Sequence, residues 1–402
     1  MFIGRDALLS CSAPALGILL TCTVPGCDGG DSDPAQPEAL TPEDGEGTPL
    51  DDGLDAEFEA AVNAQASKWT HAFGQFLFRH ETFDGNGRTC QTCHTVQTGA
   101  LSPAQVEAAW QQDPTGPLFR ALDSDDGVSG TSYDRLRNDA TVLVHIPLPD
   151  GWTLVDDPAA TSVTFRRGIP TIVNTAALDP ILMYDGRDSS LQEQAAGAIN
   201  AHAEPGRQPT EAELDAIADF QQINRFFSNP TLRKWFQGKG PAPELPEAHT
   251  EEELRGRAWI EPSEGGICGH CHGGPMLNET TEFLVLPFPP GTRFFSAFVS
   301  EFNTAGNPVY TFEVDNGDGT STIVESPDPG RAMITGDLAD LNTFKIPTLW
   351  GATKTAPYFH DNSAADLHEL GVHYSEYFQI VGVGALSEQD IADINAYLQL
   401  LK

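Results

Sequence analysis

Two short motifs, each with two cysteines and a histidine, contain the residues whose types and spacing most clearly suggest chemistry. Residues 90–94 read Cys-Gln-Thr-Cys-His and residues 268–272 read Cys-Gly-His-Cys-His. This is the spacing of c-type haem attachment, in which two thiols on one helical turn add to the vinyl groups of a haem and the adjacent histidine binds the iron. The residues expected to bind haem are Cys90, Cys93, His94, Cys268, Cys271 and His272.

Zinc is the alternative cofactor, because a Cys-x-x-Cys pair with a histidine is also half of a zinc site. A structural zinc site needs four ligands, and the three remaining cysteines, Cys11, Cys22 and Cys27, all lie near the N-terminus. We therefore expect two covalently bound haem c groups rather than a zinc-binding interaction module. A red colour of the purified protein would exclude the zinc alternative.

The composition limits the kinds of partner. The chain has 402 residues, enough for two or three domains, and its 58 Asp plus Glu against 22 Lys plus Arg give a formal net charge of −36. This charge argues against nucleic acid and anionic membrane as partners, and leaves a basic protein or a neutral small substrate open. No apolar run of about 18 residues follows the first thirty positions, so no membrane-spanning helix is expected in the body.

The N-terminal residues have the composition of an export signal and a tether. Arg5 precedes a mostly apolar run over residues 7–24, as in signal peptides. We expect a signal or lipoprotein-like leader at 1–27 and a disordered acidic tether at 28–55, which is rich in Gly, Pro, Asp and Glu. Cys27 could carry a lipid anchor, although neither it nor Cys22 follows a clean lipobox. The protein is thus expected to be exported, as a periplasmic protein or an outer-membrane or cell-surface lipoprotein.

A weak internal repeat predicts two similar, mainly α-helical domains. Residues 210–221 and 387–398 each read as an amphipathic helix that begins with a hydroxyl residue and has an acidic residue three positions later. Each helix falls at the end of its half, where cytochrome c domains place a closing helix. A Pro- and Gly-rich linker at 238–247 lies between them. We therefore expect an N-terminal haem c domain at 56–245 and a C-terminal one at 246–402.

One stretch of the second domain does not read as helix. Apolar residues alternate between about 283 and 326, and Asp-Asn-Gly-Asp-Gly at 315–319 reads as a turn. We expect a β-hairpin insertion there. The acidic turn lacks the ligand spacing of an EF-hand, so a turn is the better interpretation than a calcium loop.

Longer motifs resemble the bacterial di-haem cytochrome c peroxidase/MauG family. They occupy residues 170–174, 184–187, 191–195, 344–349 and 355–361. With both haem motifs and the closing helices, the resemblance extends over most of residues 70–402. It implies two cytochrome c-like domains, a peroxide-reacting haem in the first and an electron-transfer haem in the second.

The resemblance also implies catalytic residues above the first haem. The family has an aromatic residue, a glutamine ten positions later and a glutamate ten positions after that, and these are Tyr184, Gln194 and Glu204 here. Glu204 would be the general base, Gln194 would orient hydrogen peroxide and Tyr184 would pass electrons between the haems. The aromatic residue is usually tryptophan, whereas a tyrosine loses its phenolic proton when it is oxidised, so electron transfer would be coupled to proton movement.

A calcium ion between the haems is left open by the sequence. The family uses an asparagine two residues before Pro-Thr and backbone carbonyls of the Thr-Ala-Pro segment. Here Gly168 stands at the asparagine position, so a side-chain ligand is missing. Thr355 and Pro357 could still offer their carbonyl oxygens.

The second axial ligands depart from the usual pattern of the family. Trp110 stands sixteen residues after His94, where a histidine usually caps the first haem. We expect this iron to rest open, with His145 or His202 as alternative caps.

At the second haem, Tyr374 lies fourteen residues after His360, at the position of the second ligand. The alternatives there are His373 or an ordinary buried tyrosine. A phenolate stabilises oxidised iron, and this favours MauG-like oxidation of a protein or organic donor.

These features predict an exported di-haem oxidoreductase, a peroxidase that reacts with hydrogen peroxide and draws electrons from a donor. The donor would be a basic cytochrome, another redox protein or a MauG-type protein substrate. The alternative is a non-enzymatic di-haem electron-transfer cytochrome, which would need both irons six-coordinate. The spin state of the resting protein distinguishes the two.

Overall fold

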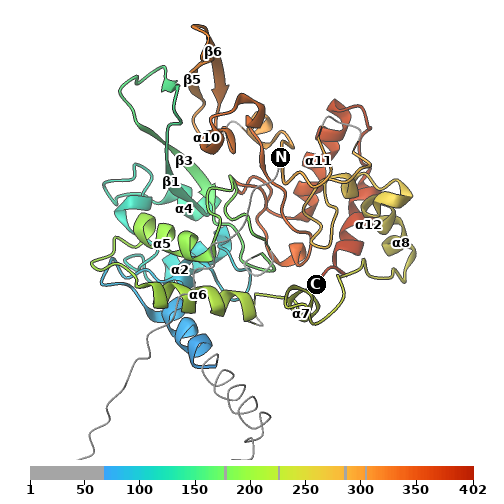
Figure 1. Ribbon diagram of the computed structural model, residues 1–402, viewed down its shortest axis with the longest axis horizontal. Coiled ribbons are helices and arrows are strands. Elements are labelled where there is room, and N and C mark those ends of the chain that lie inside the picture. Colours follow the sequence, from blue (N-terminus) through green and yellow to red (C-terminus); the bar gives the residue numbers. More distant parts are fainter. Residues whose placement is uncertain (1–67, 176–178, 225–226, 285–287, 304–305) are drawn as a thin grey trace, which may run out of the picture. The chain divides into compact units, whose positions relative to one another are not determined.

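Helices make up most of the regular structure, as the sequence predicts. The computed structural model describes residues 68–175, 179–224, 227–284, 288–303 and 306–402, so the predicted leader and tether lie outside the described residues. A first helix covers residues 68–80. The further helices, most of them labelled in Figure 1, are α2 (Cys90–Cys93), α3 (Pro103–Gln112), α4 (Asp134–Asp139), α5 (Leu191–His202), α6 (Glu211–Ile223), α7 (Pro230–Phe236), α8 (Glu251–Ile260), α9 (Val299–Phe302), α10 (Ala332–Thr335), α11 (Leu367–Ile380) and α12 (Glu388–Leu398).

Both predicted closing helices are confirmed, and each begins at the predicted residue. The Thr210 hydroxyl accepts a hydrogen bond from the Glu213 backbone N–H, and the Glu213 carboxylate accepts one from the Thr210 N–H, at the start of α6. Ser387 and Asp390 make the same reciprocal pair at the start of α12. Each pair satisfies two backbone donors that a helix N-terminus otherwise leaves without a partner.

Each closing helix is crossed by an earlier helix at a glycine. A Cβ atom on Gly74, in the helix over 68–80, would lie 1.9 Å from the Ala216 carbonyl oxygen of α6. A Cβ on Gly256 of α8 would lie 2.0 Å from the Asp393 carbonyl oxygen of α12. Only glycine permits helices to approach this closely. The same crossing therefore occurs once in each half, which the sequence repeat alone did not predict.

Among the described residues, three small antiparallel sheets add to the helices. In the first, β1 (Thr141–Pro147) pairs with β3 (Ser162–Gly168), and in the second β2 (Trp152–Leu154) pairs with β5 (Tyr310–Asp315), which pairs with β6 (Ser321–Ser326). The third pairs β4 (Phe294–Phe295) with β7 (Phe344–Lys345).

The predicted hairpin is present but shorter than expected, and it is not confined to the second half. Residues 310–326 form β5, a turn and β6 (Figure 1), whereas α9 lies within the rest of the predicted stretch. Trp152 of the first half pairs with Val314, and Phe312 packs beside both in one buried apolar cluster. The sequence-based interpretation also missed β1 and β3, whose pairing depends on contacts distant in the sequence.

Residues from Glu57 to Lys402 cluster as one unit, so the predicted domain boundary near residue 245 stays a prediction. Within this unit, separate apolar clusters surround the two cysteine motifs. None of the helices in the described part of the chain has both the length and the apolar character needed to cross a bilayer.

Candidate haem-binding sites and the segment between them

The first cysteine motif holds its histidine in one tautomer. His94 directly follows α2, and its backbone N–H donates to the Cys90 carbonyl at 2.9 Å. Its ring Nδ1 lies 2.8 Å from the Gly99 carbonyl oxygen. Because a carbonyl can only accept, Nδ1 carries the proton and Nε2 keeps a free lone pair. Burial lowers the pKa of His94, so the ring is neutral, which is the form that binds a metal.

The second motif repeats this arrangement. His272 donates its backbone N–H to the Cys268 carbonyl, and its Nδ1 lies 3.0 Å from the Leu277 carbonyl oxygen. In both motifs the carbonyl belongs to the residue five positions after the histidine. Burial again lowers the pKa of the ring. His272 also lines a cavity of about 350 Å³ together with Leu277 and Trp350.

Apolar clusters flank the thiols on two sides. Cys90 packs against the cluster that contains Phe78 and Ile199, and Cys93 packs against a different cluster, which contains Val106. At the second motif, Cys268 packs against the cluster of Ile260, Trp350 and Tyr397, while Ile267 joins a separate aromatic cluster. A flat apolar group bound between two clusters fits this arrangement.

The protonation of the thiols also bears on the choice of cofactor. Burial raises the pKa of Cys90 and Cys268 to about 12, and that of Cys93 to about 11. Without a bound cofactor the thiols are therefore neutral. Within the described residues, three or more His, Cys, Asp or Glu side chains are nowhere grouped as a metal site. The residues present fit covalently bound haem, with His94 and His272 as the iron ligands.

A buried ion pair lies beside the first motif. Arg88 Nη1 donates to Asp123 Oδ2 at 2.6 Å, and both side chains are almost fully buried. Arg88 Nη2 also donates to the Leu118 carbonyl, and Asp123 Oδ1 accepts the Leu143 N–H. Burial has the largest influence on the pKa of the Cys93 thiol, and the charges of Arg88 and Asp123 act on it as well. These two side chains therefore lie next to the thiol. Sequence reasoning missed this pair, because Arg88 precedes Cys90 without any recognisable motif.

Glu204 is tied to the segment just before the first motif. Asn86 Nδ2 donates to Glu204 Oε2 at 2.9 Å and to the His202 carbonyl at 3.0 Å. A Cβ on Gly85 would lie 2.1 Å from the Ala203 carbonyl oxygen, so the two segments touch closely. Glu204 is exposed and has a φ of +46°, a left-handed conformation that costs a non-glycine residue free energy. The fold thus holds an accessible carboxylate near α2.

Gln194 lies on the same helix that leads to Glu204. It is half-buried on α5, next to Ala195, which packs with Ile199 and Cys90. Its carboxamide makes no hydrogen bond with the described residues, so it is free to bind a ligand. The structure therefore associates Gln194 and Glu204 with the first motif, and the distance from either side chain to an iron stays a prediction.

The alternative caps for the first haem differ in their surroundings. Trp110 packs edge-on against Phe119 at 4.9 Å, and is part of the apolar core. His145 is exposed, and its Nδ1 lies 2.7 Å from the Thr164 hydroxyl. His202 has a buried Nδ1 without a hydrogen-bond partner in the described part of the chain. Of the two histidines, His202 is the better candidate for a cap.

His202 also lies near the thiols. Burial lowers the pKa of its ring, while Asp123 raises it and Arg88 lowers it. The same two charges act on Cys93. The histidine and the thiol therefore share one neighbourhood.

The segment that carries Tyr184 is held at one end by cations of the second half. Asp179 is buried, and it accepts from Arg293 Nη2 at 2.7 Å and lies 3.1 Å from Lys345 Nζ. The Lys345 backbone N–H donates to the Tyr184 carbonyl at 2.7 Å. Removing either end of such a buried pair leaves an uncompensated charge, so this contact fixes the position of the tyrosine.

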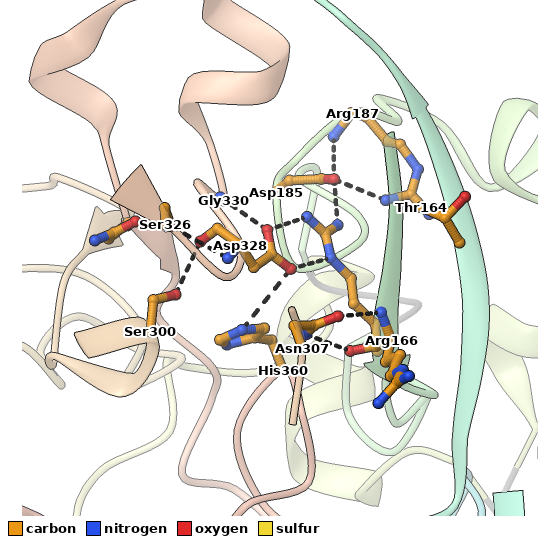
Figure 2. Close-up of polar contacts among 12 residues, drawn as sticks. Thr164, Arg166, Asp185, Arg187, Ser300, Asn307, Ser326, Asp328, Gly330 and His360 are labelled. Atoms are coloured by element: carbon orange, nitrogen blue, oxygen red, sulfur yellow. Dashed lines mark hydrogen bonds and ion pairs between the residues drawn. The ribbon is translucent and has the colours of Figure 1, made fainter. Parts of the chain in front are cut away.

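The other end of the segment belongs to a larger buried network. Asp185 accepts from Arg167 Nη1 at 2.5 Å and from Arg187 Nη1 at 2.8 Å. Arg167 also makes a bidentate pair with Asp328 of the second half, at 2.7 and 2.8 Å. Burial alone would raise the pKa of Asp185, but the two arginines hold it below its usual value. Figure 2 shows Asp185, Asp328 and His360 close together in this network.

The ring of Tyr184 faces His360. The two ring centroids are 6.5 Å apart in an edge-on arrangement, and His360 stacks on Phe344 at 3.7 Å. Burial raises the pKa of Tyr184, as does the nearby Asp361 carboxylate, so the phenol is protonated at rest. His360 Nδ1 is buried and has no partner among the described residues. Sequence reasoning used His360 only to count positions and missed this contact.

Tyr374 lies near the second pair of thiols, while its role as an iron ligand stays a prediction. It is on α11, and burial raises the pKa of its phenol, with further contributions from Cys271 and Cys268. His373 instead has its Nε2 2.7 Å from the Ala297 carbonyl oxygen, so this nitrogen carries a proton and is occupied. Tyr377 is a second phenol near Cys271, and burial raises its pKa to about 12. Sequence reasoning did not identify Tyr377.

The calcium prediction concerns Gly168, Thr355 and Pro357. Within the described residues, no hydrogen bond joins Thr355 or Pro357 to Gly168. A Cβ on Gly168 would lie 2.1 Å from Asn362 Oδ1, so an asparagine does not fit there. The observed residues therefore do not reproduce the side-chain ligand that the resemblance implies.

A family model described as di-haem cytochrome c peroxidase matches residues 68–239. The cytochrome c551 peroxidase of Nitrosomonas europaea is 26% identical over 229 residues, which are 50% of this chain and 55% of that protein. The chain thus matches little more than half the length of this curated relative.

Two solved structures are similar at lower identity. A MauG-like protein associated with microbial copper homeostasis is 18% identical, with a TM-score of 0.46 over 83% of this chain and 88% of that one. The di-haem peroxidase BthA from Burkholderia thailandensis E264 is 14% identical, with a TM-score of 0.42 over 83% and 85% of the two chains.

The matched residues 68–239 are less than half of the chain, and over this segment the chain is similar to the di-haem cytochrome c peroxidases. The matched segment contains the first cysteine motif together with Tyr184, Gln194 and Glu204.

Proposed function

We propose that the protein is an exported di-haem oxidoreductase that reacts with hydrogen peroxide at the His94 site and draws electrons through the His272 site. The observation that carries this proposal is the repeated arrangement of a neutral, oriented histidine beside two buried thiols. A segment clamped by ions of both halves lies between the two motifs in sequence and carries Tyr184. The match of residues 68–239 to the di-haem cytochrome c peroxidase model supports the peroxidase activity.

When bound, the two haems supply the iron that reacts with peroxide and the electrons that reduce it. The residues of this chain then manage the protons. Glu204 takes the proton of hydrogen peroxide as a general base, and Asn86 holds the carboxylate in place by its 2.9 Å hydrogen bond. Gln194 orients the peroxide with its unpaired carboxamide. Both roles require side chains without competing strong partners, and the Glu204 carboxylate has only an uncharged amide as its partner in the described residues.

Tyr184 is proposed to carry electrons between the halves. Its phenol is protonated at rest, because burial and Asp361 raise its pKa, so its oxidation releases a proton. The buried ion pairs at Asp179 and Asp185 keep its ring in one place.

At the second site, Tyr374 is proposed as the phenolate ligand, because it stands at the ligand position that the resemblance implies and both thiols act on its pKa. An anionic ligand stabilises oxidised iron, which favours a protein or organic substrate of MauG type over an ordinary donor. A basic redox protein would suit the net charge of −36.

The Glu204→Gln variant tests the mechanism, with Glu211→Gln as the matched control, since Glu211 is also exposed but lies in the first turn of α6. Loss of a general base typically costs about 10²–10⁴-fold in rate. We expect a loss of this size in kcat for Glu204→Gln, unchanged turnover for the control, and both haems attached in each. Full turnover by Glu204→Gln would contradict the proposal.

The electron-transfer cytochrome is the second candidate, and His202 is the observation that favours it. Its buried, unpaired Nδ1 lies in the neighbourhood of Cys93, so it could cap the first iron. A resting paramagnetic resonance spectrum separates the two functions. A high-spin ferric signal supports the peroxidase, and two low-spin signals without any high-spin component support the carrier.

Export and lipid anchoring are proposed from the sequence alone. Cell fractionation of the full chain, with Cys27→Ser and Cys22→Ser variants, tests both. Export predicts a product outside the cytoplasm, and anchoring at Cys27 predicts that only Cys27→Ser releases it from the membrane fraction.

A further inference from the structure

Gly168 and Asn362 meet at the contact between β3 and the loop after His360. A Cβ at position 168 would lie 2.1 Å from Asn362 Oδ1 and 2.9 Å from its Nδ2. The Asn362 carboxamide therefore fills the space that a side chain on residue 168 would need. The two residues are complementary: one has no side chain, and the other occupies the vacated volume.

The Asn362 carboxamide also connects elements that are distant in the sequence. Its Nδ2 donates to the carbonyl oxygens of Asp139 at 2.9 Å and Ala140 at 3.2 Å, at the C-terminal end of α4. Carbonyls in the last turn of a helix otherwise lack a partner. At the same contact, the backbone N–H of Gly168 donates to the His360 carbonyl at 2.7 Å. Three hydrogen bonds thus join the 360–362 loop to α4 and β3.

The backbone of Asn362 indicates that its side chain is needed. Its φ of +60° lies in the left-handed region, which glycine adopts without steric cost. Asparagine tolerates this conformation better than most residues, but a side chain retained there still carries a cost. The two hydrogen bonds of Nδ2 offset that cost.

The charges around this contact do not favour a bound cation. The neighbouring Asp361 carboxylate already accepts from Asn303 Nδ2 at 2.6 Å and from the Ser363 N–H at 3.1 Å. Asp139 lies near two guanidinium groups, those of Arg135 and Arg166. A divalent cation prefers free carboxylate and carbonyl oxygens, whereas here the Asp361 carboxylate and the Asp139 and Ala140 carbonyls already accept from amides, and arginines lie near the Asp139 carboxylate.

We propose that the Asn362 carboxamide joins the 360–362 loop to α4 and β3 without a metal ion, in place of the calcium that the sequence resemblance implies. The neutral amide bridges the carbonyl oxygens by donating hydrogen bonds, whereas a cation would bridge them by coordination. The proposal concerns stability and metal content, so it is independent of the peroxidase activity.

The first test uses the full-length, haem-loaded wild-type protein. We expect the same melting temperature in excess EDTA and in excess CaCl₂, and no stoichiometric calcium by elemental analysis after gel filtration. A ligand that binds only the folded state raises the melting temperature. A wild-type melting temperature that rises with calcium and falls with EDTA would therefore overturn the proposal, except where the calcium binds at the acidic turn between β5 and β6.

The Asp318→Asn variant settles that exception, because Asp318 lies in the acidic turn between β5 and β6. A calcium response that this variant abolishes belongs to the turn and leaves the contact at Asn362 metal-free, as proposed. A response that persists overturns the proposal.

Variants at the contact itself provide the second test. Asn362→Gly leaves two carbonyls unpaired, and should lower the melting temperature by about 2–4 °C, equally with EDTA and calcium. Gly168→Asn alone should destabilise more, because the new side chain collides with Asn362. The double variant Gly168→Asn/Asn362→Gly should regain stability with added calcium, since it restores the ligand position. A calcium response in wild type that Asn362→Gly removes would show that Asn362 is itself a ligand, and would contradict the proposal.

Discussion

The two halves of the molecule share one framework and differ in what surrounds it. In each half, an earlier helix crosses the closing helix at a glycine, and the histidine of the cysteine motif is oriented by the carbonyl of the residue five positions later. Beside the first motif lie a buried Arg88–Asp123 pair and a histidine. Beside the second lie aromatic rings, among them the phenols of Tyr374 and Tyr377. The comparison teaches that a common scaffold can carry one site with polar, charged neighbours and another with aromatic neighbours.

Replacing Arg88 should have the largest effect, and should affect the first half alone. In Arg88→Met the Asp123 carboxylate stays buried without its cation, and losing one partner of a buried pair costs about 3–5 kcal/mol. Chemical denaturation measures this loss. The spectrum of the second haem should be unchanged, and an equal disturbance of both haems would show that the halves do not differ as described.

Replacing Tyr374 should change the second haem next most strongly. If Tyr374 is the ligand as proposed, Tyr374→Met exchanges an anionic ligand for a thioether and should raise the reduction potential by on the order of 0.1 V, within the roughly 0.8 V range that axial ligands span. Tyr377→Phe is the matched control, since it removes the neighbouring phenol on the same helix. A redox titration in which only the control shifts the potential would transfer the ligand role to Tyr377.

The glycine crossings should respond alike in both halves. Gly74→Val and Gly256→Val each push a side chain into a facing helix carbonyl, and overpacking of this kind costs about 1–3 kcal/mol. We expect each variant to lower the melting temperature and the haem content of its own half. A loss for one variant only would show that the two crossings are not equivalent.

The dependence of stability on pH gives the smallest expected effect. The pKa values of His202 and His373 are lowered in the folded protein, mainly by burial. Each histidine therefore binds its proton less readily when folded, so stability is lost as the pH falls from about 6.5 through the folded pKa. The slope is at most about 1.4 kcal/mol per pH unit for each histidine.

Single glutamine variants check this assignment. Arg88, Asp123, Arg187 and His145 face His202, while Asp361, Glu376 and Glu301 face His373. His202→Gln and His373→Gln should each flatten the acid limb of the denaturation profile by one proton. If the acid limb of the denaturation profile has the same slope in His202→Gln as in the wild type, another interaction holds the His202 ring of the wild type neutral.

The sequence predicted the local parts of this structure well. The closing helices begin at Thr210 and Ser387, because their capping residues are three positions apart and act within one helical turn. The strands at 310–315 and 321–326 were found because alternation is a local pattern. Tyr374 was chosen by counting within a motif, and although Cys268 and Cys271 act on its pKa, its role as an iron ligand stays a prediction.

The parts that the sequence did not predict depend on residues far apart. Asn86 and Glu204 are 118 positions apart, and their hydrogen bond follows from tertiary packing alone. The pairs Arg88–Asp123 and Arg167–Asp328 join residues that belong to no common motif. The distances from Gln194 and Tyr184 to the haems also depend on packing between distant residues, so they stay predictions.

The three-stranded sheet of β2, β5 and β6 has a consequence for dissecting the molecule. Because β2 precedes residue 245 and its partner strand follows it, a fragment ending there would expose an unpaired strand edge beside Trp152. Such a fragment is prone to self-association, and the complementary piece would keep an open edge at Phe312. Expressing either portion by itself should therefore give insoluble material, whereas co-expression of both pieces should allow them to reassemble through this shared strand.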